Sequence, residues 1–352
     1  MNPAATFDVR YSVSIVGVGA RTPLGFNAAA SAAAVRGAIS GVREHPYFVD
    51  TAGEPISVTM DAGISPDADG VDRLHPLALS AMREAMAPLG SLEKLAVPIP
   101  MIIGLCEPRP GRPEQLEVEL PRRLEAELPI RVVVMPHGHS AGLMALQEGA
   151  RVISEQQAEF CLVGGVDSYL QWETLEWLDV ERQLMSEQNR SGFIPGEGAG
   201  FCLLASTTVA RRRQLDVRAW LVNAATARER NLIKTNDICI GEGLGAAIAQ
   251  AAAVLNLPEE RVNASYCDLN GERYRSEEFA FTVLRTQSAF VNILDNVTPA
   301  DCWGDLGAAS GPLFAMLAIA SGMRGYARGP RSMLWTGSES GYRSAAVLHL
   351  PM

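Results

Sequence analysis

Histidine is scarce in this 352-residue chain, and none of its five histidines lies between Ser140 and Leu348. They are His45, His75, His137, His139 and His349. Imidazole is the side chain most suited to proton transfer near neutral pH, and it is a common metal ligand. Chemistry that depends on an imidazole from that long stretch is therefore excluded.

Cysteine is also sparse, and no two cysteines have the CxxC spacing of a zinc site or redox motif. The six are Cys106, Cys161, Cys202, Cys239, Cys267 and Cys302. We therefore expect no bound metal and no disulfide framework. Cys161 and Cys202 lie in apolar runs, which predicts small buried side chains. Cys302 has no histidine near it in sequence to activate it, so a structural thiol is the simpler interpretation.

Basic residues are outnumbered, with 30 Lys and Arg against 40 Asp and Glu and a net charge of −10. Nucleic acids and anionic membranes both require a basic surface, so neither is expected as a partner. The longest apolar stretches, such as 312–320, are too short to span a bilayer. No charged-then-apolar leader precedes the first expected strand, which predicts a cytoplasmic, reducing location.

Short β-rich runs alternate with alanine-rich helical patterns, the order typical of a layered α/β fold. Strands are expected at 12–18, 97–105, 131–135, 160–166 and 200–205, and again at 217–223, 264–269, 333–335 and 344–350. Helices are expected at 28–35, 143–153, 244–255, 276–284 and 308–321. The similar order predicts two halves from an internal duplication, 1–210 and 211–352, packed as one compact unit.

The segment GVGARTPLG at 17–25 places glycines after a strand, as a dinucleotide-binding turn does. Thr22 occupies the third glycine position, and no acidic strand end follows about 20 residues later, so no nucleotide cofactor is expected. The same segment resembles the opening of the β-ketoacyl-ACP synthases. Further motifs follow in that family's order: HSAG at 139–142, LVGGVDS at 162–168, GFIPGEGAG at 192–200 and LGAASG at 306–311.

The resemblance extends over nearly the whole chain and implies a thiolase-like fold of five layers, αβαβα, with the nucleophile position at the start of a buried helix. The residues at the reacting positions differ from the family's. By the resemblance, His139 stands where the family has its cysteine nucleophile. Asn270 stands for the first catalytic histidine and Gly304 for the second.

The family's glycine-rich loop near the C-terminus reads SESG here, so Glu339 and Ser340 stand at the rim of the implied pocket. A decarboxylative condensation without a thiolate and paired imidazoles lacks its nucleophile and its electrostatic stabiliser. The expectation is therefore a pocket that has lost this chemistry.

Ser140 beside His139 suggests an alternative, an acyltransferase or hydrolase in which the imidazole activates the hydroxyl. Adjacent residues at a helix start rarely face each other, and no acid that would orient the ring is evident from the sequence. The simpler interpretation is that His139 fills the space of a thiolate and is held neutral by the positive helix end. Non-catalytic binding of acyl-CoA or acyl-ACP is a third hypothesis.

We therefore predict a non-condensing ketosynthase-like protein that acts as a structural or regulatory partner, as chain-length-factor-like subunits do in that family. The resemblance implies a homodimer, or a heterodimer with a ketosynthase-like subunit, paired through the strand at 131–135. An acyl carrier protein or another protein is a further expected partner. The pocket is expected to be closed, with Glu339 or Asp305 paired to Arg273 or Arg343.

Overall fold

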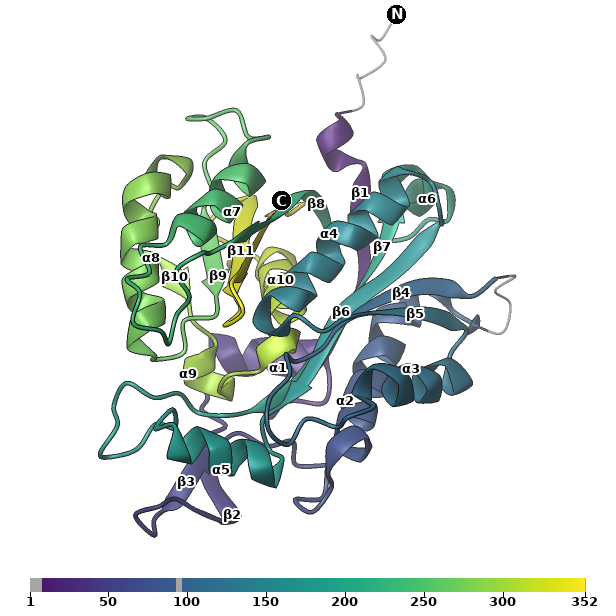
Figure 1. Ribbon diagram of the computed structural model, residues 1–352. Helices are drawn as coiled ribbons and strands as arrows, with labels where there is room; N and C mark the ends of the chain where they lie inside the picture. Colours follow the sequence, from purple (N-terminus) through teal and green to yellow (C-terminus); the bar gives the residue numbers. More distant parts are fainter. Residues whose placement is uncertain (1–7, 93–96, 352) are drawn as a thin grey trace, which may run out of the picture.

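The computed structural model describes residues 8–92 and 97–351 (Figure 1). Within them, ten strands form one mixed sheet in the order β10-β9-β11-β12-β8-β1-β7-β6-β4-β5. The first group of five strands is β1 (Val13–Arg21), β4 (Ile99–Gly104), β5 (Ile130–Met135), β6 (Phe160–Ser168) and β7 (Glu197–Ser206). The second group is β8 (Ala219–Arg228), β9 (Ala264–Cys267), β10 (Asn296–Val297), β11 (Arg331–Gly337) and β12 (Tyr342–His349).

The two groups meet at β1 and β8, which pair antiparallel at only two positions, Ser14 with Trp220 and Ile15 with Ala219. Outward from this junction both groups repeat one pattern, two antiparallel pairings followed by two parallel ones. The strands predicted at 160–166 and 264–269 both lie inside the sheet, as β6 and β9. We propose that the predicted halves, 1–210 and 211–352, correspond to these two groups.

Helices form the other three layers. They are α2 (Gly70–Met86), α3 (Leu116–Glu127), α4 (Ala141–Ser154), α7 (Glu242–Ala252), α8 (Arg273–Thr286) and α10 (Ser310–Met323). α4 contacts β4 and β6 on one side and β8 and β12 on the other, and α10 contacts both β7 and β11. The outer faces of the two strand groups are covered by α2 with α3 and by α7 with α8. The predicted order of layers, αβαβα, is confirmed.

α10 is apolar on every side, and its sequence, SGPLFAMLAIASGM, has no polar stripe. A helix of this kind is stable only when it is surrounded by protein. Pro312 is tolerated because it lies in the first turn, where its missing N–H has no partner to lose. Gly142 of α4 allows the two central helices to touch, since a Cβ there would lie 2.4 Å from Cδ of Pro312.

The helix α3 continues through Pro121, which lies inside it. Leu116, Leu120 and Leu124 recur at intervals of four and are fully buried in the cluster beneath α2. This burial outweighs the loss of one backbone hydrogen bond at the proline.

Several elements were not predicted from the sequence. They are α2, the hairpin of β2 (Arg43–Val49) and β3 (Pro55–Val58), α5 (Trp172–Val180), α6 (Thr207–Arg212) and α9 (Ala300–Trp303). The hairpin and α5 lie together at the lower edge of Figure 1 around their own small apolar cluster, which includes Phe48 and Leu178. The expected helix at 28–35 is α1 (Ala28–Arg36).

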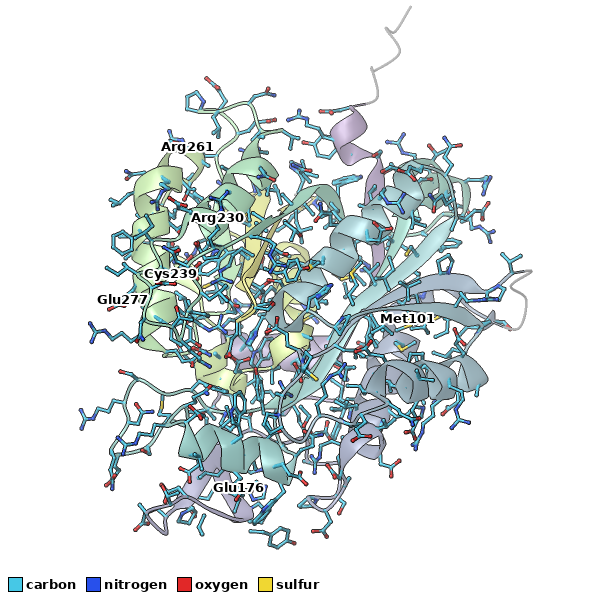
Figure 2. The ribbon with its side chains drawn as sticks, in the orientation of Figure 1. Met101, Glu176, Arg230, Cys239, Arg261 and Glu277 are labelled. Carbon is cyan, nitrogen blue, oxygen red and sulfur yellow. The ribbon has the colours of Figure 1, made fainter. Side chains whose placement is uncertain are left out.

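Side chains divide between core and surface as this layering requires. Met101 is fully buried in the first strand group, whereas Glu176, Arg261 and Glu277 are exposed at the periphery (Figure 2). None of the helices in the described part of the chain is long and apolar enough to cross a membrane.

The central helix α4 provides a test of this core. We expect Leu146→Ala, at a fully buried position, to lower the free energy of unfolding by about 2–5 kcal/mol, because it removes apolar contacts and leaves a cavity. Leu284→Ala, at a position 71% exposed on α8, is the matched control and should leave it nearly unchanged. Urea unfolding followed by circular dichroism measures both. Equal effects of the two changes would contradict the burial of α4 between the sheet halves.

Candidate functional site

His139 lies where the sequence predicted, at the N-terminal end of the buried helix α4. It belongs to a single 3-10 turn, Gly138–Ser140, between β5 and α4. Gly138 adopts φ = +61°, a conformation that favours glycine, and this lets the chain turn sharply from the strand into the helix. The imidazole is 5% exposed and points into the interior.

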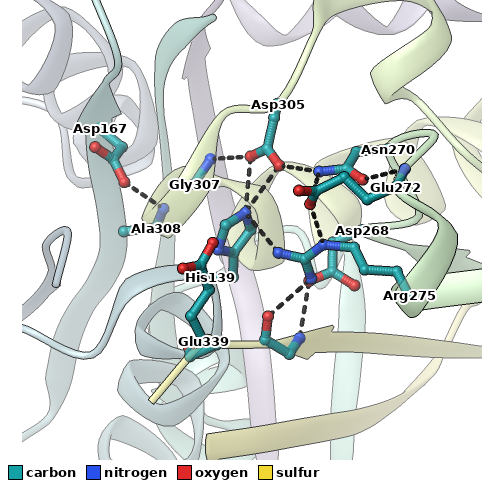
Figure 3. Close-up of polar contacts among 12 residues, drawn as sticks. His139, Asp167, Asp268, Asn270, Glu272, Arg275, Asp305, Gly307, Ala308 and Glu339 are labelled. Atoms are coloured by element: carbon teal, nitrogen blue, oxygen red, sulfur yellow. Dashed lines mark hydrogen bonds and ion pairs between the residues drawn. The ribbon is translucent and has the colours of Figure 1, made fainter. Parts of the chain in front are cut away.

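Asp305 holds the ring of His139. The Nε2 atom lies 2.8 Å from Oδ1 and 2.9 Å from Oδ2 of this carboxylate (Figure 3). Asp305 also accepts hydrogen bonds from the backbone N–H of Gly307 at 2.8 Å and from Nδ2 of Asn270 at 2.7 Å. The acid that orients the ring was not evident from the sequence, because it comes from a segment 166 residues away.

The contact favours the charged form of both side chains. Burial by itself disfavours a charged imidazole, but the carboxylate of Asp305 outweighs it and raises the pKa of His139. Burial likewise disfavours the carboxylate, yet His139 and then Arg275 bring the pKa of Asp305 well below its usual range. The expectation of a neutral imidazole at the helix start considered the helix end and omitted this carboxylate, which favours the charged form.

Arg275 of α8 is a second buried cation, and its Nη2 lies 3.4 Å from Nε2 of His139. Its guanidinium donates to Asp268 at 3.0 Å, to Glu272 at 3.1 Å and to the carbonyl of Gly337 at 2.8 Å. Three donor contacts satisfy a charge that would otherwise be costly to bury. The network joins α8, the loop after β9 and the end of β11 behind His139 (Figure 3).

The arginine predicted to close the pocket was the wrong one. Arg273 is exposed and pairs with Glu277 at 2.7 Å, and Arg343 pairs with Glu278 at 2.7 Å. α8 begins at Arg273, so a residue two positions further along, on a different face of the helix, points inward. The sequence pattern did not reveal which face of α8 points toward His139.

Asn270 and Gly304 have different surroundings, although both were expected at the site. Asn270 is buried, and besides donating to Asp305 it donates to Oε2 of Glu272 at 3.0 Å. Gly304 has φ = +74°, and a Cβ there would lie 2.7 Å from Oγ1 of Thr59. A side chain at 304 would therefore point at Thr59, and the neighbouring Asp305 is the residue that reaches His139.

Ser140 is buried, but its hydroxyl is directed away from the imidazole. Its Oγ donates to the carbonyl oxygen of Tyr342 at 2.9 Å, and its backbone N–H donates to Oγ of Ser338 at 2.8 Å. Among the described side chains, His139 has no hydrogen bond to a hydroxyl or thiol. A nucleophile activated by a histidine needs that contact.

Glu339 lines the same small cavity as His139, but no hydrogen bond joins the two side chains. Glu339 pairs with Nζ of Lys234, which also lies 3.5 Å from Oε1 of Glu272. Ser340 is exposed, and its hydroxyl bonds to Glu107. Lys234, which the sequence analysis missed, thus links the rim to the buried carboxylates in place of the expected arginine.

A further buried pair lines the other side of the pocket. Arg109 donates to Asp167 at 2.7 Å, and its guanidinium lies 4.0 Å from the ring centroid of Tyr169. The other oxygen of Asp167 accepts the backbone N–H of Ala308 at 3.0 Å, which holds the start of the α10 segment against β6 (Figure 3). Burial raises the pKa of Tyr169 well above its ordinary value, so its hydroxyl remains neutral.

Little space remains around these side chains. The cavity bounded by Gly138, His139, Arg109, Tyr169 and Glu339 measures about 50 Å³. A second cavity beside Asn270 and Asp305 measures about 10 Å³. Pockets for small ligands ordinarily have roughly 300–1,000 Å³. A much larger cavity, of about 1050 Å³, lies elsewhere, next to α1.

One group of metal-ligating side chains occurs within residues 8–92 and 97–351: Glu229, Cys239 and Glu278, whose ligand atoms lie within 4.8 Å of one another. Glu278 is already neutralised by Arg343, and both oxygens of Glu229 accept backbone N–H groups. Burial raises the pKa of the Cys239 thiol to about 11, which disfavours the thiolate a metal needs. These side chains therefore do not fit a metal site.

Comparisons with known proteins agree with this fold. Residues 134–210 match the family model "Beta-ketoacyl synthase, N-terminal domain". No curated protein matches the sequence. The chain therefore has the thiolase-like fold of the ketosynthases, and the matched segment includes His139 and α4.

The similar solved structures are ketosynthases. "The ishigamide ketosynthase/chain length factor" superposes with a TM-score of 0.82 at 16% identity and covers 98% of this chain and 100% of its own. A type II PKS acyl-carrier protein in complex with its ketosynthase, AntDE:AntF, gives 0.80 at 15% identity over 97% and 100%. The ketosynthase from module 6 of the bacillaene synthase of Bacillus subtilis 168 gives 0.79 at 15% identity over 97% and 72%.

The ion pair predicts an order of histidine titrations. With five histidines in the chain, ¹³C-labelled imidazole NMR should resolve them, and His139 should titrate above 6.5. His45 and His349 should titrate below 6.5, because burial lowers the pKa of both. In Asp305→Asn the pKa of His139 should fall below 6.5, since burial and Arg275 remain while the carboxylate charge is gone. A wild-type His139 that titrates below 6.5 would contradict the ion pair.

The same pair determines a stability window. Because the pKa of His139 is raised, the contribution of His139 to the free energy of unfolding is fully present below pH 6.5, the ordinary pKa of histidine. This contribution is lost as pH rises through the raised pKa. The lowered pKa of Asp305 means that its contribution is present above 3.8 and is lost as pH falls. The difference in unfolding free energy between wild type and Asp305→Asn should therefore be greatest between these values.

Proposed function

We propose that this chain is a ketosynthase-like protein that does not condense acyl groups and acts as a structural or regulatory partner of other proteins. The observation that carries the proposal is the His139–Asp305 ion pair at the start of α4, closed in by a cavity of about 50 Å³. An imidazolium paired with a carboxylate is not a nucleophile, and a cavity of this size excludes an acyl chain.

The alternative of altered acyl chemistry at His139 and Ser140 has less support. The Ser140 hydroxyl donates to the carbonyl of Tyr342. The Nε2 atom of His139 faces Asp305, and no hydrogen bond joins the imidazole to the Ser140 hydroxyl. The second alternative, an acyl-CoA or acyl-ACP binder at this pocket, requires more space than the cavity of about 50 Å³ that Arg109 and Tyr169 line.

A dimer through β5 is part of the proposal. β5 is the last strand of the sheet, paired on one side only, and Val133 in its middle is 55% exposed. An unpaired apolar edge favours pairing with a second strand. The partner is a second copy or a ketosynthase-like subunit, and the similarity to a ketosynthase/chain length factor supports this choice. A carrier protein is a further candidate, since one similar structure holds a ketosynthase with its acyl-carrier protein.

The cytoplasm is the proposed location. All six cysteines are free thiols, as a reducing compartment requires, and five of them are buried. The pKa values of Cys202 and Cys161 are raised to about 12 by burial, so they are inert hydrophobic side chains there.

Enzyme assays test the proposal directly. We expect no condensation of malonyl-ACP with an acyl primer, and none in His139→Cys either. Cysteine at this position would face Asp305 and Arg275 without the imidazoles that polarise the thioester. Mass spectrometry of the acyl carrier protein detects the product, with an authentic ketosynthase as positive control. Turnover at a few per cent of that control, abolished by His139→Ala, would contradict the proposal.

The interface has its own test. Light scattering of wild type should give twice the chain mass of 37.7 kDa, and Val133→Lys should give a mass near 37.7 kDa, because a charge on the edge strand opposes strand pairing. Val291→Lys, at a position 61% exposed beyond α8, is the control and should remain dimeric. A wild type that is monomeric at micromolar concentration, with or without an added ketosynthase, would disprove pairing through β5.

A further inference from the structure

A groove of about 1050 Å³ lies between α1 and the second half of α10, away from His139. α10 begins at Ser310 beside the small cavity at Asp305, whereas the groove is lined by its residues from Met316 onward. The two hollows are therefore at opposite ends of one buried helix. The groove is about twenty times larger than the space around His139.

The groove exists because one face of α1 carries only small side chains. Ala28, Ala29, Ala32 and Ala33 form this face, since residues one, four and five positions apart lie on one side of a helix. The opposite wall is formed by Met316, Ile319, Ala320 and Met323 of α10. The floor is apolar, and methionine side chains adapt readily to ligands of different shape.

Three arginines meet at the end of the groove that is formed by the C-terminus of α10. The guanidinium of Arg36 lies 4.0 Å from the ring centroid of Tyr326, and Nη1 of Arg218 lies 3.6 Å from Sδ of Met323. Arg324 directly follows Met323 and also lines the groove.

Few negative charges oppose these arginines. Within the part of the chain that the structure describes, neither Arg36 nor Arg324 forms an ion pair, and Arg218 has only the exposed Asp216 at 3.6 Å. A positive cluster of this kind is an exception in a chain with a net charge of −10. Arginine at the C-terminal end of a helix is favoured by the helix dipole, but this accounts for Arg324 and not for the convergence of all three.

The other end of the groove, at the start of α1, carries an acidic side chain. Glu84 lies there, and its carboxylate accepts the backbone N–H groups of Ala20 at 2.9 Å and Ala28 at 3.0 Å. Burial raises the pKa of Glu84. The groove thus has a positive end and an apolar body, so a ligand with a charged head has one favoured orientation.

We propose that this groove binds an amphipathic anion, with an unbranched apolar chain along the alanine face of α1 and a carboxylate or phosphate head at Arg36, Arg218 and Arg324. Guanidinium groups bind both heads through paired hydrogen bonds. The volume suits a long-chain ligand, because it lies at the upper end of roughly 300–1,000 Å³ for small-molecule sites. The site is separate from the His139 pocket and does not depend on the proposed function.

Titration with cis-parinaric acid, a fatty acid that fluoresces in apolar surroundings, tests the groove in the full-length protein. We expect saturable binding at micromolar concentration. Ala33→Trp should weaken it at least tenfold by filling the groove, whereas Ala30→Trp, an exposed position on α1 outside the lining, should not. Circular dichroism checks that both variants are folded. Equal binding by the two variants, or no saturable binding by wild type, would overturn the proposal.

Charge is tested at the surface, where folding is not at risk. The double variant Arg36→Gln with Arg218→Gln should lose at least fivefold in affinity, and Arg122→Gln with Arg190→Gln, two exposed arginines elsewhere, should match wild type.

Dodecanoate and dodecyl phosphate should displace the probe, and their relative affinities identify the preferred head. Equal displacement by uncharged dodecyl maltoside would refute the anionic head. A loss of the dimer in Ala33→Trp, measured by light scattering, would instead make the groove a contact between copies.

Discussion

The buried carboxylate of Asp305 is the contact on which the centre of this molecule depends. It binds the ring of His139 at the start of α4, the backbone of Gly307 at the approach to α10, and Asn270 in the loop after β9. These three segments come from both strand groups. Removing one partner would leave a charge in a dry interior, which is far more costly than the pair itself is favourable. Both central helices are therefore positioned by a polar contact as well as by apolar packing.

Around this carboxylate, a site that resembles a catalytic pocket is filled by charges that neutralise one another. Arg275 supports the imidazole from behind, and Arg109 with Tyr169 occupies the opposite wall. Each guanidinium has its own carboxylate partner, Asp268 with Glu272 for the first and Asp167 for the second. These paired charges hold the side chains around His139 in place, and they support the proposal that the site does not carry out acyl chemistry.

The fold was largely predictable because its signals are local. The apolar run of β6 and the five glycine-containing motifs identified the layers and the place of His139. The charge network was not predictable, because His139 and Asp305 are 166 residues apart in the sequence. The inward direction of the Arg275 side chain also depends on which face of α8 packs against the site. The sequence did hold a weak indication that Arg275 is buried. Residues 278–279, three and four positions further along the same helix, are also buried. The groove beside α1 was also not predictable, because the alanine-rich sequence of α1 does not indicate which element packs opposite it or how much space remains between them.

The central position of α10 also affects how the chain reaches its folded state. The helix is apolar on all sides and contacts strands from both groups, so neither group alone has the surface to cover it. A nascent chain released before β11 and β12 are made would present this helix to water, where exposed apolar surface leads to aggregation. The contacts of α10 therefore favour folding of the two strand groups together, since each group covers only part of this apolar helix.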